Sequence, residues 1–154
     1  MYRIGFDAKR LFNNFTGLGN YSRWLVQSLK NIYPENEYCL FTPKISKNFN
    51  NDFFNEDNFK IYTTTDIFKS YWRSFSIMWD IKKKGMNIYH GLSNEIPFVK
   101  NPECKFIVTI HDLMYEVFPH DFSIIDRNIY RIKTVNSCKN ADLIHTVSQS
   151  TKND

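Results

Sequence analysis

The chain has 154 residues, of which 42% are hydrophobic, 23% charged and 17% aromatic. These shares are close to globular averages, so they exclude a disordered or fibrous chain and indicate one folded domain with a sizeable aromatic core. The formal net charge of +4 is small and no stripe of Lys and Arg occurs at helical spacing, so we expect no nucleic-acid partner.

The first third of the chain alternates strand and helix. Residues 2–7 have the pattern of a short strand, and a loop rich in Asn and Gly follows over residues 13–19. Apolar residues then recur at spacings of three and four, which predicts a helix that ends before Pro34. These residues are Leu18, Tyr21, Leu25, Leu29 and Ile32. A second strand is predicted over residues 37–42.

The middle of the chain is less regular. Residues 44–58 are polar and Asn-rich and predict a long loop, followed by a strand over residues 59–63. An amphipathic helix ending at Gly85 comes next, and we expect its aromatic stripe to cover the sheet, with a membrane or acceptor-lipid face as the alternative. The stripe consists of Phe68, Tyr71, Trp72, Phe75, Met78 and Trp79. For Lys82, Lys83 and Lys84 we expect a solvated helix end, with an anionic membrane surface as the alternative.

The last third contains the most strand-like run of the chain. Residues 87–90 and 105–110 predict two strands, and the continuous apolar run of the second suits a parallel sheet covered on both faces. Ser123 and Asp126 have capping-box spacing, which predicts a helix over residues 123–139 that presents Ile125, Ile129, Ile132 and Val135 on one side. Residues 142–147 form the last predicted strand. This order predicts a Rossmann-like, doubly wound α/β fold: a mostly parallel sheet with helices on both faces.

The cysteines and the N-terminal segment give information on the cellular location of the protein. Cys39, Cys104 and Cys138 are odd in number and lack C-x-x-C spacing, so we expect reduced residues that contribute to packing. Asp7 interrupts the N-terminal segment before any apolar stretch of signal-peptide length, and no run of 18 apolar residues occurs. We therefore expect a cytoplasmic location, with contact at the inner face of the membrane left open.

Polar residues follow several predicted strands at their carboxyl ends, where parallel sheets form ligand crevices. These residues are Asp7, His90, His111, Asp112 and Ser148. A lone histidine is more often structural, but several polar residues at equivalent ends indicate a shared site. His111 and Asp112 are adjacent and would point to opposite faces of a strand, so we expect no metal site.

Gly17 and Gly19 precede the predicted first helix, where backbone N–H groups can approach an anion; a plain glycine turn is the alternative. The glycines come about ten residues after the strand, and no acid ends the second strand to hold a ribose. A nicotinamide cofactor is therefore not expected. The sequence also contains no G-x-S-x-G motif for hydrolytic chemistry.

Five segments resemble, in the same order, blocks of the N-terminal domain of the family 4 glycosyltransferases. They are IGFDAKRL (4–11), TGLGNY (16–21), HGLSNEIP (90–97), TIHDL (109–113) and VSQSTKND (147–154). Members of this family are retaining, nucleotide-sugar-dependent enzymes of the GT-B fold. The resemblance implies that residues 1–154 are the acceptor-side Rossmann-like domain, and that the donor-binding C-terminal domain, absent from these residues, is needed for transfer.

The resemblance also implies roles for individual residues. Gly17 and Gly19 match the loop that approaches the donor phosphate and sugar, and His111 matches the catalytic histidine that faces the reacting sugar. On the acceptor side it places His90, Ser93, Glu95 and Asp112. The expected reaction moves a sugar to a glycan or lipid-linked acceptor without a metal or other cofactor. The alternative from another class is a non-catalytic sugar- or anion-binding module.

Overall fold

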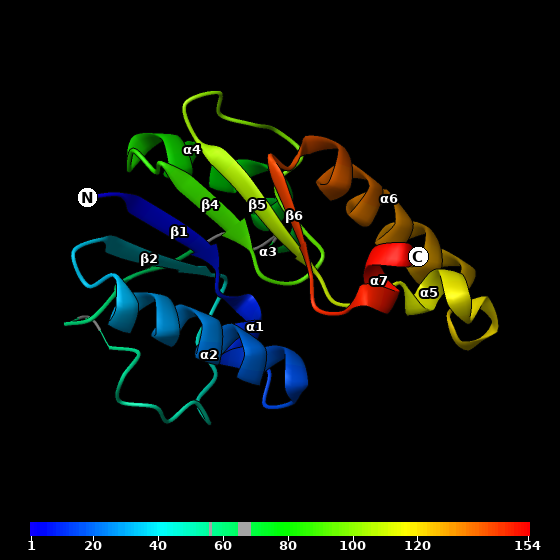
Figure 1. Ribbon diagram of the computed structural model, residues 1–154, viewed down its shortest axis with the longest axis horizontal. Helices are drawn as coiled ribbons and strands as arrows, with labels where there is room; N and C mark the ends of the chain where they lie inside the picture. The colour runs from blue at the N-terminus through cyan, green and yellow to red at the C-terminus, as the bar shows by residue number, and fades with distance from the viewer. Residues whose placement is uncertain (56, 65–68) are drawn as a thin grey trace.

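The computed structural model describes residues 1–55, 57–64 and 69–154 (Figure 1). Six strands form one sheet in the order β3-β2-β1-β4-β5-β6, and every neighbouring pair is parallel. The strands are β1 (Arg3–Asp7), β2 (Glu37–Thr42), β3 (Lys60–Thr63), β4 (Ile88–Gly91), β5 (Lys105–Ile110) and β6 (Leu143–Thr146). The predicted Rossmann-like, doubly wound α/β class is confirmed.

Helices cover both faces of this sheet, with α2 on one face and α4 and α6 on the other (Figure 1). The helices are α1 (Lys9–Asn13), α2 (Gly17–Ile32), α3 (Lys69–Tyr71), the π-helix η1 (Trp72–Ser76), α4 (Ile77–Lys83), α5 (Met114–Val117), the 3₁₀-helix η2 (Pro119–Asp121), α6 (Ile124–Asn140) and α7 (Gln149–Asn153). The short helix α1 was not predicted, because five residues are too few to show a helical period.

Side chains that alternate along the strands fill two cores. On the α2 side, Phe6 and Leu40 pack with Val26 of the helix. On the opposite side, Tyr89 and Phe106 pack with residues of η1 and α4. Because both faces are buried, the central strands are apolar almost throughout, as the run at residues 105–110 predicted.

The expected aromatic stripe of residues 68–79 covers the sheet only in part. Trp72 is buried, but Tyr71 and Phe75 are exposed and Trp79 is 75% exposed; Phe68 lies outside the described residues. The physical reason is the π-helix η1, whose i→i+5 turn adds one residue and shifts the helical register. Of the predicted stripe, Trp72 and Met78 face the core, where Ile77 and Ile81 join them.

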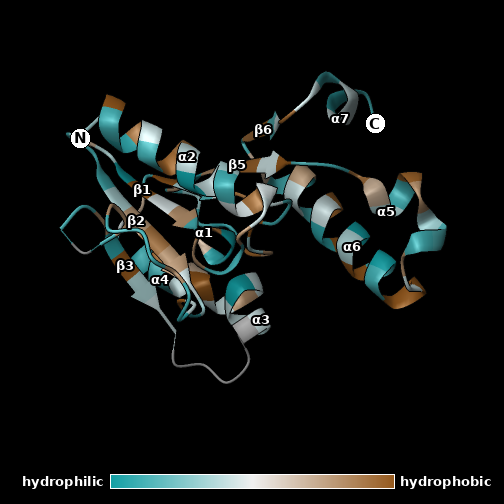
Figure 2. Cartoon of the chain, turned by 90° about the horizontal axis from the view of Figure 1, so that it is seen from below, coloured by the Kyte–Doolittle hydropathy of each residue, from teal (hydrophilic) through white to brown (hydrophobic). Residues whose placement is uncertain are grey.

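Helix α6 begins as predicted, since the Ser123 hydroxyl accepts a hydrogen bond from the Asp126 amide at 3.0 Å. The stripe of Ile125, Ile129, Ile132 and Val135 does not pack on the sheet, and all four side chains are exposed. The helix packs instead through small residues near its C-terminal end, chiefly Thr134 and Ser137. Its N-terminal half extends beyond the sheet together with α5, and carries hydrophobic bands (Figure 2).

The long loop over residues 44–58 agrees with the prediction, and within its described part Phe54 is buried against the α2 side of the core. Gly85 follows α4 with a φ of 62°, which ends the helix as expected. All three cysteines are free. Burial raises the pKa of Cys39 and of Cys104 to about 12, which favours the neutral, unreactive thiol.

Candidate functional site

A pocket of about 420 Å³ opens at the carboxyl ends of β1, β4 and β5. From β1 the chain first builds β2 and β3 on one side and then crosses to β4 on the other side. The boundary between β1 and β4 is thus the topological switch point, where open α/β sheets bind their ligands. The pocket has the volume of a small-molecule site and lies where the fold predicts one.

The structure brings several of the predicted site residues to this pocket. Its wall includes Ser93, Glu95, His111 and Asp112, together with Leu18, which stands between the two glycines of the predicted loop. Residues distant in the sequence therefore meet in one place, because the strands that precede them are neighbours in the sheet.

His90, predicted for the acceptor side, lies below this pocket and does not line it. Its side chain is buried in β4, with Nε2 2.8 Å from the hydroxyl of Thr109. Burial, with a smaller contribution from His145, lowers the pKa of His90 to about 4. The ring is therefore neutral at pH 7 and shielded from a ligand in the pocket.

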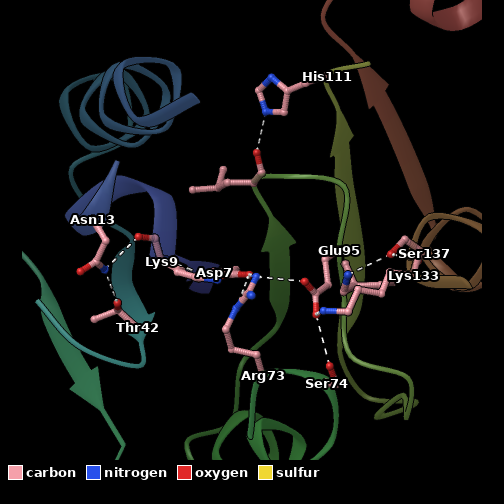
Figure 3. Close-up of polar contacts among 12 residues, drawn as sticks. Asp7, Lys9, Asn13, Thr42, Arg73, Ser74, Glu95, His111, Lys133 and Ser137 are labelled. Carbon is pink, nitrogen blue, oxygen red and sulfur yellow. Dashed lines mark hydrogen bonds and ion pairs between the residues drawn. The ribbon is translucent and has the colours of Figure 1, made fainter. Parts of the chain in front are cut away.

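His111 is half-buried and follows the carboxyl end of β5 (Figure 3). One of its ring nitrogens is used in a structural hydrogen bond. Its Nε2 lies 2.8 Å from the carbonyl oxygen of Leu92, so this nitrogen carries the hydrogen and donates it. The ring packs edge-on against Tyr21, with centroids 4.8 Å apart. Nδ1 makes no hydrogen bond within the part of the chain that the structure describes, so it can accept one from a ligand.

The glycine segment lies inside the first turn of α2, with Thr16 as the N-cap. The Asn14 side-chain oxygen accepts hydrogen bonds from the amide of Thr16 and from that of Gly19, both at 3.0 Å. A Cβ at Gly19 would overlap the carbonyl oxygen of Asn14, whereas a Cβ at Gly17 would meet open space. Gly19 is therefore needed for the close approach of α1 and α2, and only the amides of Gly17 and Leu18 remain available to an anion.

Sequence reasoning missed a buried ion-pair network beneath the pocket (Figure 3). Arg73, 8% exposed, donates from Nη2 to Asp7 at 2.5 Å and forms an ion pair with Glu95 at 3.2 Å. Lys133 of α6 donates to Glu95 at 3.0 Å. Burial opposes the charge of Arg73, but Asp7 and Glu95 outweigh it and raise its pKa above the usual range.

This network joins β1, η1, the loop after β4 and α6. The sequence indicates Asp7 by its place at a strand end and Glu95 by the family resemblance, but it indicates neither Arg73 nor Lys133. The only sequence signal for Arg73 is that it is the one basic residue between Tyr71 and Trp79. The π turn that directs its side chain toward Asp7 leaves no signature in an α-helical period.

The loop after β4 is tied to the end of β5. Asn94, at a φ of 54°, accepts a hydrogen bond from the His111 amide at 2.9 Å and donates one to the Asp112 carbonyl oxygen at 3.1 Å. A Cβ at Gly91 would overlap the carbonyl oxygen of Glu95. These contacts hold Glu95 and His111 at fixed positions in the pocket wall.

Among residues 1–55, 57–64 and 69–154, no group of three or more His, Cys, Asp or Glu side chains is arranged to hold a metal ion. Within the same residues, no helix has the length and apolar character needed to cross a membrane. Models of known protein families show no match to the chain, and a search of curated proteins found no match either. Fold and site together define a Rossmann-like α/β protein with a charged pocket at its switch point.

Proposed function

We propose that this chain is the N-terminal, acceptor-side half of a retaining glycosyltransferase that moves a sugar from a nucleotide-sugar donor to a glycan or lipid-linked acceptor. The observation that carries the proposal is the meeting of His111, Glu95 and the first turn of α2 around one pocket at the switch point. The five sequence segments that resemble family 4 glycosyltransferases contain these same residues.

In this reaction the first turn of α2 faces the leaving nucleotide diphosphate. The amides of Gly17 and Leu18, together with the positive end of the helix dipole, favour the negative charge that develops there. His111 uses Nδ1 to accept a hydrogen bond from the reacting sugar, while Leu92 holds the ring in place. Glu95 acts as a positioning residue, because both its oxygens already bind Arg73, Lys133 or Ser74.

The test is a transfer assay with a panel of nucleotide sugars on the complete gene product. We expect His111→Ala to reduce kcat by about 10²- to 10⁴-fold, the range of a positioned proton-transfer group. His120→Ala, at an exposed histidine outside the pocket, is the matched control. Thermal unfolding of both variants separates lost chemistry from lost folding. Full transfer activity in a folded His111→Ala variant would contradict the proposal.

The purified 154-residue chain should show no transfer by itself, because in this proposal most donor contacts belong to a second domain. Robust donor-dependent transfer by this chain would contradict that division of the site. Tight saccharide binding by the complete gene product without transfer to any acceptor would instead support the non-catalytic binding module.

We also propose that the exposed side of η1 and α4 contacts an anionic membrane surface, which would bring a lipid-linked acceptor close. Tyr71, Phe75 and Trp79 line a groove of about 400 Å³, together with Lys82 and Lys100. Exposed aromatic rings beside lysines suit the interface between acyl chains and anionic headgroups.

Co-sedimentation with vesicles tests this contact. The chain should bind vesicles that contain phosphatidylglycerol more strongly than vesicles of phosphatidylcholine alone, and the double variant Trp79→Ala, Lys82→Gln should lose the difference. Ile45→Ala with Lys47→Gln, in the loop after β2, gives a control pair of exposed residues. Equal binding to both vesicle types would contradict the contact.

A further inference from the structure

Two adjacent cations line the pocket and have no side-chain partner among the described residues. Lys9 and Arg10 open helix α1 directly after β1, and both contribute to the pocket wall. Neither side chain forms an ion pair or a hydrogen bond with any other residue that the structure describes. Both are only partly exposed, so water does not fully replace the missing partners.

The carboxylates of Asp7 and Glu95, next to these cations, already have other partners. Asp7 accepts from the Lys9 amide at 3.1 Å with one oxygen and from Arg73 with the other. Glu95 accepts from Ser74 and Lys133 with one oxygen, and its second oxygen pairs with Arg73. Asp7 and Glu95 are thus already held by Arg73 and Lys133, and neither forms an ion pair with Lys9 or Arg10.

The environment of Lys9 is unfavourable for its charge in the absence of a ligand. Burial lowers the pKa of Lys9 and the charges of Arg73 and Arg10 lower it further, while Asp7 and Glu95 offset this only in part. An anion bound beside these groups would raise the pKa of Lys9 again and favour its charged form, because it supplies a further opposite charge.

An aromatic wall faces the same space. Tyr115, Phe122 and Tyr130 line the pocket, and the ring of Tyr130 lies 5.9 Å from that of Tyr115 and 6.1 Å from that of Phe122. Aromatic faces stack well on the C–H face of a pyranose ring, and Ser93 and Asp112 add groups that can bind hydroxyls.

We propose that this pocket binds a saccharide that carries an oxyanion, a phosphate or a carboxylate, with the ring on the aromatic wall and the oxyanion at Lys9 and Arg10. The binding of such a ligand is inferred from the residues that line the pocket and does not depend on the proposed reaction. Its role as the acceptor substrate rests on the proposed glycosyltransferase function. The proposal thereby narrows the acceptor class to anionic saccharides.

Calorimetric and NMR titrations of the 154-residue chain test the binding step. The probes are glucose 1-phosphate and glucuronate as two sources of the oxyanion, with methyl glucoside as the neutral counterpart and inorganic phosphate as the anion without a ring. We expect both anionic sugars to bind more tightly than either control. The double variant Lys9→Gln, Arg10→Gln should weaken their binding by about 10- to 100-fold, as expected when charge-assisted hydrogen bonds are lost.

Lys47→Gln, at an exposed lysine far from the pocket wall, should leave the affinities unchanged. Equal affinity for methyl glucoside and the anionic sugars would overturn the proposal, as would unchanged binding in the double variant. Inorganic phosphate that binds as tightly as glucose 1-phosphate would also overturn it, because the ring would then contribute nothing. These outcomes are independent of transfer activity, so failure here is distinct from failure of the proposed reaction.

Discussion

Gly17 and Gly19 stand two positions apart in the first turn of α2 but tolerate a side chain differently. We expect Gly19→Ala to reduce the free energy of unfolding by about 3 kcal/mol or more, because the added Cβ overlaps a backbone oxygen that cannot easily move. Gly17→Ala should be neutral or stabilising by up to about 1 kcal/mol, because its Cβ meets open space within a helix. Urea unfolding of both variants measures the difference.

Equal stability of these two variants would contradict the assignment of Gly19 to packing. The difference between Gly17 and Gly19 also decides which variants can test ligand binding at the start of α2. A larger residue at Gly19 disturbs the fold, so only Gly17 variants can report on the approach of a ligand to the helix N-terminus.

Buried His90 should make the stability of the fold depend on pH. Its pKa is about 4 in the folded state and about 6.5 in an unfolded chain, so the unfolded state takes up the proton first as the pH falls. Stability is therefore fully present above pH 6.5 and declines toward pH 4. We expect a slope of up to about 1.4 kcal/mol per pH unit from this residue.

Urea unfolding at several pH values between 4 and 7 measures this slope. His90→Gln should flatten it, whereas His120→Gln, at an exposed histidine, should leave it unchanged. A His90→Gln variant with the same pH dependence as the unmodified chain would show that the decline has another origin.

At the scale of elements, the ion-pair network links β1, η1 and α6 around the pocket floor. We expect Arg73→Met to reduce the free energy of unfolding by about 3–5 kcal/mol, because Asp7 and Glu95 would be left buried without their shared cation. Arg127→Met breaks a more exposed pair with Glu116 and should change it by less than about 1 kcal/mol. Thermal and urea unfolding give both values. Similar small losses in the two variants would mean that the network contributes little to stability.

The same elements show where sequence patterns succeed. The strands and the start of α6 follow from local signals: continuous apolar runs and the Ser123 cap with Asp126. The π turn at residues 72–76 does not, since it depends on how the helix meets the sheet and the buried Asp7. The periodicity of residues 71–79 therefore predicted a helix correctly but assigned Phe75 and Trp79 to the wrong environment.

At the scale of the whole molecule, one side of α6 leaves apolar side chains in contact with water. Ile125 is 72% exposed and Ile132 is 60% exposed. At a spacing of seven residues, the two side chains lie on the same face of the helix, about two turns apart. We expect the 154-residue chain to self-associate through this stripe, because burial of each side chain is worth about 1.5–3 kcal/mol. Sedimentation should show an apparent mass that rises with concentration.

The double variant Ile125→Lys, Ile132→Lys should remain monomeric over the same range. Ile45→Lys, at an exposed isoleucine in the loop after β2, serves as the control and should still associate. A constant monomer mass for the unmodified chain would contradict this prediction.

The sequence by itself determined the α/β class, the parallel sheet and the polar strand ends at Asp7, His111 and Asp112, because hydrophobic runs, caps and strand-end residues are local signals. Only the tertiary structure decided which of these residues share a pocket, since that depends on strand order and on the π turn that brings Arg73 to Asp7 and Glu95. It also leaves Lys9 and Arg10 without side-chain partners in the part of the chain that the structure describes, because Asp7 and Glu95 already bind Arg73 and Lys133.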